Sequence, residues 1–156
     1  FIKYAREKME RNELFMLTIC VNKKPVGMID IHNIDLQKHQ AEIGYWISEK
    51  YENQGFVKQG LKELIKIIPS KFKIDKLLIY IDVDNVKSKF IPISLGFKKE
   101  IEISQFEFYN GSYHDFEIYG LNVNERNIAN GKSEIFTNKE QSEYFNFPHC
   151  LSSCKS

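Results

Sequence analysis

The stretch that decides the fold reads Ala41-Glu42-Ile43-Gly44-Tyr45-Trp46-Ile47 and then, after a short gap, Tyr51-Glu52-Asn53-Gln54-Gly55-Phe56-Val57-Lys58. The first part is typical of a β-strand, and the second is a polar loop whose glycine precedes an apolar-periodic helix. Such a loop presents backbone N–H groups and the positive end of a helix dipole to an anion. Glycine also occurs in such turns for backbone geometry alone, so the rest of the chain has to support an anion site.

The composition predicts one globular domain. The chain has 156 residues, of which 42% are hydrophobic and 13% aromatic, enough to bury a core without disulfides. Its 22 basic and 21 acidic residues are interspersed and leave a net charge of +1, which disfavours nucleic acid and anionic membranes as partners. The apolar runs are too short to span a bilayer and no signal-peptide pattern opens the sequence, so we expect a cytoplasmic protein.

The three cysteines do not form a metal-binding motif. Cys20 lies in an apolar, strand-like run, which favours a buried small hydrophobic residue. Cys150 and Cys154 lie beside His149, but no fourth ligand follows at a recognisable spacing. We therefore predict no metal site.

Hydrophobic periodicity predicts alternating groups of strands and helices. Pro69 is expected to end the first long helix, and Asn110-Gly111 is typical of a two-residue hairpin turn. Another turn is expected over residues 22–25. The expected helices cover Ile2–Asn12, the residues after Gly55 as far as Pro69, and Val86–Leu95, and the expected strands cover Leu14–Val21, Val26–Ile34, Ala41–Ile47, Lys76–Val83, Phe97–Tyr109 and Tyr113–Leu121.

The character of the sequence changes after Leu121. Residues 122–156 are polar and lack a sustained hydrophobic period. We therefore divide the chain into a domain over residues 1–121 and a polar, loosely ordered C-terminal extension over residues 122–156.

Several short motifs, in this order, resemble the GNAT acetyltransferase superfamily, with the ribosomal-protein alanine/serine N-acetyltransferases as the nearest subgroup. The resemblance covers about Phe1 to Leu121 and implies an α/β fold with a mixed, mostly antiparallel sheet flanked by helices. The family's first strand and helix have no counterpart before Phe1, so we expect an N-terminally truncated domain. The motifs are Ala41–Trp46, Gln54-Gly55, Asp84–Ser88, Ile91-Pro92, Leu95–Phe97, Asn110–Asp115 and Tyr119–Leu121.

The resemblance implies acetyl-CoA as the cosubstrate. In the phosphate loop, this chain has Glu52 where the family usually has Gln or Arg, and Val57 where it has Gly or Ala. An acid near a pyrophosphate is electrostatically unfavourable, and Val57 is expected to narrow the approach to the backbone. The implied cofactor-binding residues are Tyr45, Trp46, Ile47, Gln54, Gly55, Phe56, Val57, Lys58 and Asn85.

The reaction implied by the resemblance is direct attack of a primary amine on the thioester in a ternary complex. Ser88 matches the position of the general acid and Glu107 that of the general base, with Phe106 and Phe108 predicting an apolar neighbourhood for Glu107. Alternatives stay open at each position. Ser88 and Asn85 are also typical helix-capping residues, Glu107 is also compatible with an outward-facing strand position, and Glu42 is a second candidate carboxylate.

The acceptor implied by the nearest subgroup is a protein N-terminal amine, with a polyamine or aminoglycoside-like amine as alternatives. A different class of function also stays open, in which the chain is a degenerate or fragmentary domain that binds CoA or has a non-catalytic role. Glu52, Val57 and the missing first elements favour that alternative. A third hypothesis, an interaction module, rests only on the aromatic segment Tyr144–Phe147.

Overall fold

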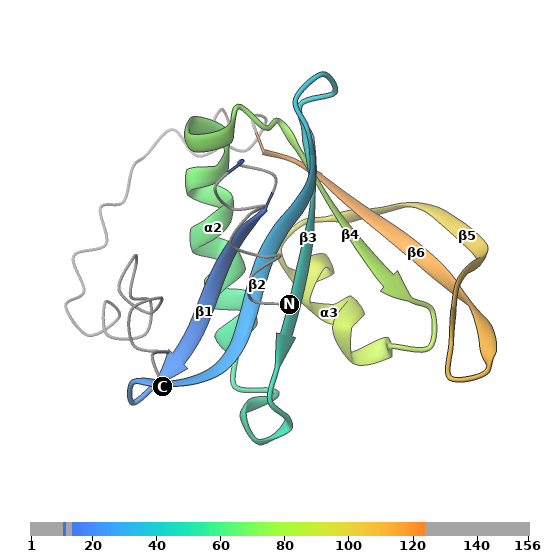
Figure 1. Ribbon diagram of the computed structural model, residues 1–156, viewed down its shortest axis with the longest axis horizontal. Helices are drawn as coiled ribbons and strands as arrows, with labels where there is room; N and C mark the ends of the chain where they lie inside the picture. Colours follow the sequence, from blue (N-terminus) through green and yellow to red (C-terminus); the bar gives the residue numbers. More distant parts are fainter. Residues whose placement is uncertain (1–10, 12–13, 124–156) are drawn as a thin grey trace.

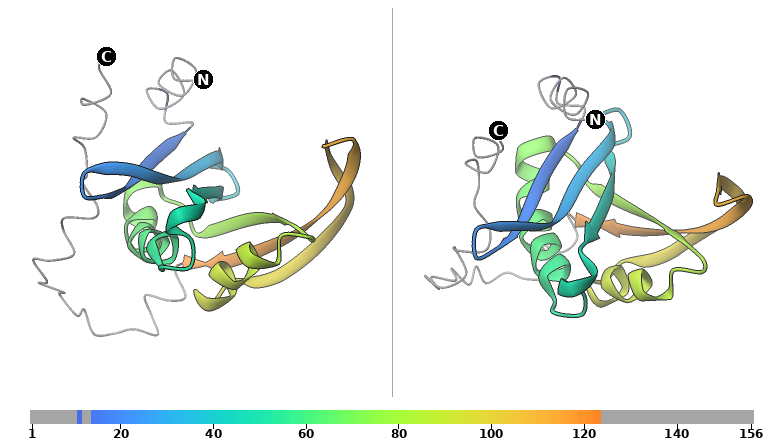
Figure 2. Two further views of the ribbon diagram at one scale, coloured as in Figure 1. Left: turned by 90° about the horizontal axis from the view of Figure 1, so that it is seen from below. Right: turned by 60° about the horizontal axis from the view of Figure 1, so that its bottom comes forward.

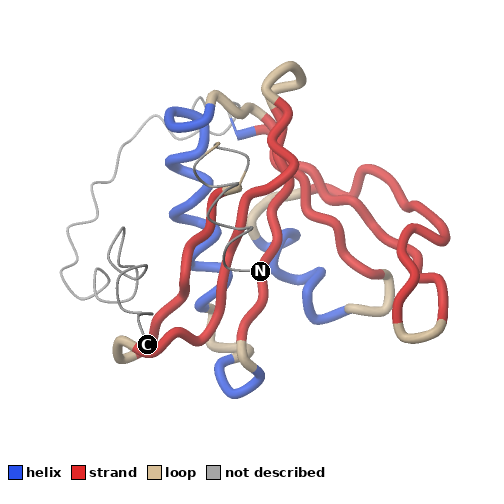
Figure 3. Tube along the Cα trace, viewed as in Figure 1, coloured by secondary structure: helices blue, strands red, loops and turns tan. Residues whose placement is uncertain are grey.

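The computed structural model describes Arg11 and residues 14–123 (Figure 1). The order of elements predicted from Leu14 to Leu121 is confirmed, with one added 3-10 helix, η1, between β3 and α2 (Figure 3). The elements are β1 (Phe15–Val21), β2 (Lys24–Asp35), β3 (Gln40–Ile47), η1 (Glu49–Tyr51), α2 (Phe56–Phe72), β4 (Lys76–Asp82), α3 (Val86–Ser94), β5 (Lys98–Tyr109) and β6 (Ser112–Asn122).

Some sequence predictions fall on other parts of the chain. The helix predicted over Ile2–Asn12, apart from Arg11, lies outside the described residues, as do residues 124–156 with His149, Cys150 and Cys154. The predicted boundary after Leu121 falls within β6, and the next residues continue the fold. Val123 is buried, and its N–H donates to the Asp75 carbonyl at 2.8 Å.

The six strands form one sheet in the order β1-β2-β3-β4-β6-β5. Every neighbouring pair is antiparallel except β3 and β4, which are parallel. This confirms the predicted mixed, mostly antiparallel sheet. Figure 2 shows α2 and α3 on the same side of the sheet, with the β5–β6 hairpin curving away from the other strands.

The feature of the sheet that matters for function is the short contact between β3 and β4. Their pairing covers three positions and ends at Glu42 opposite Leu78. Beyond this point β3 continues to Ile47 paired only with β2, and β4 continues to Asp82 paired with β6. The two strands therefore separate toward their carboxyl ends (Figure 1).

The hydrophobic core lies between α2 and the sheet and includes side chains from β1, β2, β3, β4 and β6. Leu61, Leu64 and Ile68 recur at spacings of three and four along α2 and are fully buried, as the helical period predicts. They share one core cluster with Ile29 and Ile31 of β2, which are also fully buried. Burying each of these side chains contributes about 2 kcal/mol and fixes the start of α2 relative to the sheet.

The end of α2 differs from the prediction, because the helix continues through Pro69 to Phe72. A proline lacks the N–H that would bond the carbonyl four residues earlier, yet the last turn is held by other contacts. The Lys73 N–H donates to the Pro69 carbonyl at 3.1 Å, and Phe72 packs edge-to-face on Phe15 with 5.3 Å between ring centroids. Tertiary packing therefore outweighs the local preference.

The turn predicted over residues 22–25 is tighter than expected. Asn22 and Lys23 alone form it, with φ values of 50° and 64°, while Lys24 and Pro25 already belong to β2. Lysine is rare at positive φ, so the pattern did not indicate that Asn22 and Lys23 alone would form the turn. The Asn110-Gly111 turn between β5 and β6 is confirmed, with φ values of 49° and 81°.

Among the helices of the described part of the chain, none has the length and apolar character needed to cross a membrane.

Candidate functional site

A cavity of about 720 Å³ opens where β3 and β4 separate. Its walls are the end of β3, the loop and first turn of α2, and α3. This volume is typical of small-molecule sites. The cavity brings together Ser88 and every predicted cofactor-binding residue except Gln54.

The first turn of α2 forms one end of the cavity. Gly55 caps the helix with a φ of 80°, a conformation that favours glycine, and a Cβ built at this position meets no atom within 4 Å. The first bond of the helical ladder runs from the Gln59 N–H to the Gly55 carbonyl, so the preceding Val57 and Lys58 N–H groups take no part in it. No acidic side chain lies in this turn. The helix end is therefore suited to an anion.

Two predicted loop residues behave differently from expectation. The Gln54 side chain is exposed and donates from Nε2 to the Lys50 carbonyl at 3.1 Å, so it is turned toward η1. The Val57 side chain is only 4% exposed and belongs to the hydrophobic core while also lining the cavity. Most of its bulk is therefore taken up by the core, and less of it narrows the cavity than the sequence predicted.

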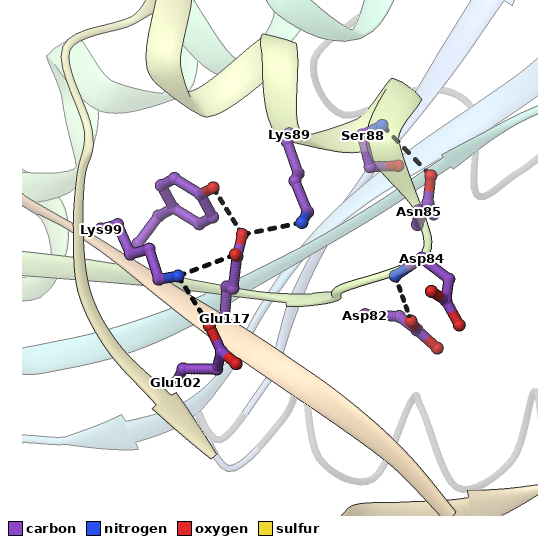
Figure 4. A network of polar contacts seen from close by, with 9 residues as sticks. Asp82, Asp84, Asn85, Ser88, Lys89, Lys99, Glu102 and Glu117 are labelled. Carbon is purple, nitrogen blue, oxygen red and sulfur yellow. Dashed lines mark hydrogen bonds and ion pairs between the residues drawn. The ribbon is translucent and has the colours of Figure 1, made fainter. Parts of the chain in front are cut away.

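A hydrogen-bonded group joins β3 to α3 across the cavity. The Tyr45 hydroxyl donates to the Ser88 carbonyl at 3.0 Å, and the Ser88 N–H donates to Asn85 Oδ1 at 3.2 Å. Asn85 thus caps α3, which confirms the structural alternative for this residue (Figure 4). Burial raises the pKa of Tyr45, so its hydroxyl stays a neutral donor. The backbone of Ser88 is used for structure, while its half-buried side chain lines the cavity.

The environment predicted for Glu107 is wrong. Glu107 is exposed on β5 opposite His114 of β6, and it is absent from the cavity lining. Its neighbours Phe106 and Phe108 are 47% and 60% exposed, so they enclose no apolar pocket. Phe106 instead packs against Tyr80 and Phe116, with ring centroids 5.5 and 5.2 Å apart.

Glu42 does not line the cavity either, but it lies at the point where β3 and β4 separate. It is the last residue of β3 paired with β4, and its Oε2 lies 3.4 Å from His32 Nε2. The other ring nitrogen of His32 lies 2.6 Å from Asp30 Oδ2, and this hydrogen bond is the main cause that raises the pKa of His32. Strand register therefore places an imidazole between two carboxylates, which spacing along the chain did not indicate.

A buried carboxylate, Asp82, lies at the end of β4. It accepts hydrogen bonds from the Tyr109 hydroxyl and, at 2.7 Å, from the Asp84 N–H, and its Oδ2 lies 2.8 Å from His114 Nδ1. These contacts lower the pKa of Asp82, and the hydrogen bond from Tyr109 makes the largest contribution. The same hydrogen bond is the main cause that raises the pKa of Tyr109 to about 12. Ligand-type atoms of Asp82, Asp84 and His114 lie within 4.8 Å of one another, and Asp82 and His114 are already joined by their 2.8 Å contact.

Glu117 of β6 anchors the α3 wall of the cavity (Figure 4). Its carboxylate accepts from Lys99 Nζ at 2.8 Å and from the Tyr119 hydroxyl at 2.7 Å, and it pairs with Lys89 of α3 at 3.0 Å. These contacts lower the pKa of Glu117 to about 2, and the hydrogen bond from Lys99 makes the largest contribution. The partners lie on different elements, so the sequence pattern did not indicate this network.

The cavity also contains residues that the sequence did not single out. Lys87 and Phe90 of α3 line it, although only Ser88 of this helix and its N-cap residue Asn85 were predicted as site residues. The three- and four-residue spacing of Lys87, Phe90 and Ile91 places them on one face of α3, and that spacing was a signal in the sequence.

Part of this chain is similar in sequence to a known protein family. Residues 1–98 match the family described as an acetyltransferase (GNAT) domain. A Bacillus subtilis (strain 168) protein named "Putative ribosomal N-acetyltransferase YdaF" is 34% identical over 95 residues, covering 61% of this chain and 52% of that protein. The ribosomal-protein-serine acetyltransferase of Escherichia coli (strain K12) is 31% identical over 110 residues, covering 70% and 62%. The chain therefore spans less than two thirds of the length of these relatives.

A solved structure of RimL, the ribosomal L7/L12 alpha-N-protein acetyltransferase, in complex with coenzyme A is similar in fold and sequence. The TM-score is 0.74 and the sequence identity 26%, over 78% of this chain and 68% of that chain.

Proposed function

Because this chain belongs to the GNAT acetyltransferase family, we propose that it transfers an acetyl group from acetyl-CoA to a primary amine. The observation that carries the proposal is the cavity between the separating strands, with the start of α2 at one end and Ser88 on its α3 wall. Coenzyme A bound to the similar RimL structure supports the choice of cofactor.

In this proposal the cofactor lies between β3 and α3. The first turn of α2 binds the pyrophosphate through backbone N–H groups and the helix dipole. Residues 45–47 pair with β2 on one side only, so their other edge faces the cavity. Backbone N–H groups at this edge would polarise the thioester carbonyl, and Tyr45 and Trp46 would form the apolar wall beside the pantetheine.

The acceptor must be a free amine before it reacts. Its nitrogen attacks the thioester carbon, a C–N bond forms, and the C–S bond breaks with release of the CoA thiolate. Ser88, which lines the cavity, is the proposed general acid: its hydroxyl gives a proton to this sulfur and regains one from solvent. A carboxylate takes the proton that the amine loses.

We propose Glu42 as this base in preference to Glu107, because Glu42 lies where β3 and β4 separate and Glu107 is exposed on β5. Glu42→Gln, which keeps the size of the side chain, is expected to lower kcat/KM about 100-fold. Glu107→Gln is expected to change it less than about threefold, because the side chain is solvated. Initial rates with acetyl-CoA and a peptide acceptor over a range of pH measure kcat/KM for both variants. A larger loss in Glu107→Gln than in Glu42→Gln would support Glu107 as the base, as the family resemblance implied.

A protein N-terminal amine is the proposed acceptor, because the two curated relatives are named for acetylation of ribosomal proteins. A small polyamine is the second candidate, favoured by Asp30, Glu42 and Asp82. Strand register places these three carboxylates on one face of the sheet, opposite the core residues. Rates with peptides that begin with Ser or Ala, measured beside rates with spermidine, distinguish the two acceptors.

Binding of acetyl-CoA tests the cofactor site directly. Gly55→Trp is expected to weaken binding, measured by calorimetry, at least about tenfold, because the new ring would occupy the cavity and the backbone has a φ of 80°. Gly111→Trp is a matched control, because Gly111 has a φ of 81° and the same open surroundings but lies in the β5–β6 turn. Equal effects of the two substitutions, or no binding by the unsubstituted protein, would contradict the proposal.

A further inference from the structure

An ion pair spans the cavity at the proposed phosphate end. Glu52, which follows η1, and Lys87, in the first turn of α3, come from opposite walls, and both line the cavity. Lys87 Nζ lies 3.0 Å from Glu52 Oε2. The Lys87 side chain is 77% exposed and that of Glu52 33% exposed.

The charges around Lys87 are mostly acidic in the structure. The hydrogen bond to Glu52 is the main cause that raises the pKa of Lys87, and Glu49 adds a smaller effect. Lys58, in the first turn of α2, also lines the cavity. The phosphate end of the cavity therefore holds two lysines, one of which is held by a carboxylate.

We propose that Lys87 binds a phosphate of coenzyme A and that Glu52 holds this lysine in the absence of the cofactor. This inference rests on the proposed function. On binding, the ammonium of Lys87 exchanges the Glu52 carboxylate for the phosphate, with no change in covalent bonds. The pyrophosphate and the 3′-phosphate of the cofactor offer the same chemistry, and the experiment below distinguishes them.

The energies favour such an exchange. An ion pair between exposed side chains contributes only about 0.2–1 kcal/mol, so it opens readily. The pyrophosphate as a whole and the 3′-phosphate each carry about two negative charges at pH 7, against one for a carboxylate, and they form strong charge-assisted hydrogen bonds with an ammonium group. The long, exposed stem of Lys87 allows it to reach a ligand in the cavity. Glu52 then acts against binding, both by holding Lys87 and by repelling the phosphates.

The experiment compares the dissociation constants of CoA, 3′-dephospho-CoA and pantetheine by calorimetry. Glu52→Gln is expected to bind CoA about three- to tenfold more tightly, and Lys87→Gln about tenfold more weakly. Pantetheine, which lacks these phosphates, is expected to bind all variants equally. If the Lys87→Gln loss persists with 3′-dephospho-CoA, the pyrophosphate is the ligand of Lys87; if it disappears, the 3′-phosphate is.

The double variant tests whether the two residues act together. In the Lys87→Gln background, Glu52→Gln is expected to tighten CoA binding less than it does alone, because no lysine is left to be released. Lys62→Gln, on the exposed side of α2, removes the same charge elsewhere and is expected to leave affinity within about twofold.

The outcomes also distinguish this inference from the proposed function. If the unsubstituted protein binds CoA and Lys87→Gln binds it equally well, only the role of Lys87 is overturned. If neither the unsubstituted protein nor Glu52→Gln binds CoA, both proposals are overturned. If CoA binding is detectable only in Glu52→Gln, the result would support the proposal that the ion pair of Glu52 with Lys87 opposes CoA binding.

Discussion

Glu117→Ala is expected to lower the free energy of unfolding by about 2–3 kcal/mol, the largest stability effect that we predict for a polar residue. The Glu117 side chain is 11% exposed and that of its partner Lys89 is 19% exposed. Removing one member of a buried ion pair leaves the other charge without compensation, which costs more than the pair contributes. Urea denaturation followed by circular dichroism at about pH 7 measures the change.

Glu102→Ala is the matched control for this prediction. Glu102 contacts the same Lys99 Nζ at 2.7 Å, but its side chain is 49% exposed. Its removal is expected to cost less than about 1 kcal/mol, because an exposed ion pair contributes little. Equal losses for Glu102→Ala and Glu117→Ala would show that burial of Glu117 does not determine its contribution.

The pH dependence of stability provides a second readout on Glu117. Its pKa falls from an ordinary value of 4.5 to about 2 in the folded protein, so folding favours the charged form. The stabilisation is therefore fully present above about pH 4.5 and is lost as the pH falls toward 2. The difference in unfolding free energy between the unsubstituted protein and Glu117→Gln should shrink over this range and stay constant above it.

The Glu117 network also shows which parts of the fold could be predicted. Alternation along the chain predicted β6 to within one residue at each end. It did not indicate that Glu117 faces inward, because its partners Lys89 and Lys99 come from α3 and β5. The approximate extents of the elements depend on local patterns, whereas a buried charge depends on register and on packing between distant segments.

In the candidate site, too, the parts formed by one continuous segment could be predicted from the sequence, and the parts that depend on packing between strands could not. The loop and first turn of α2 were predicted because Gln54-Gly55 and the helix that follows form one continuous segment. The surroundings of Glu107 could not be predicted, because β5 is an edge strand of the sheet and is irregular. Its pairing with β6 shifts between Ile103 and Glu107, and Gln105 has a φ of 53°. Aromatic neighbours in the sequence therefore do not become an apolar pocket in space.

Ser88→Ala is expected to lower kcat about 100-fold while the dissociation constant of acetyl-CoA stays within about twofold. The two structural contacts of Ser88 use its backbone, since its N–H donates to Asn85 and its carbonyl accepts from Tyr45. Alanine keeps both contacts and removes only the hydroxyl. The substitution therefore separates the proposed proton transfer to the leaving thiolate from the architecture of α3. Steady-state rates and calorimetry on the same preparation measure the two quantities.

Ser94→Ala is the control on the same helix, because the Ser94 hydroxyl donates to the Ile91 carbonyl at 2.8 Å and is already used by the helix. It is expected to keep kcat within about twofold. Acetyl thioesters with a more acidic leaving thiol should reduce the loss in Ser88→Ala, because a better leaving group needs less help from an acid. A loss that is the same for all leaving thiols, or a parallel loss of CoA affinity, would assign Ser88 to binding and not to proton transfer.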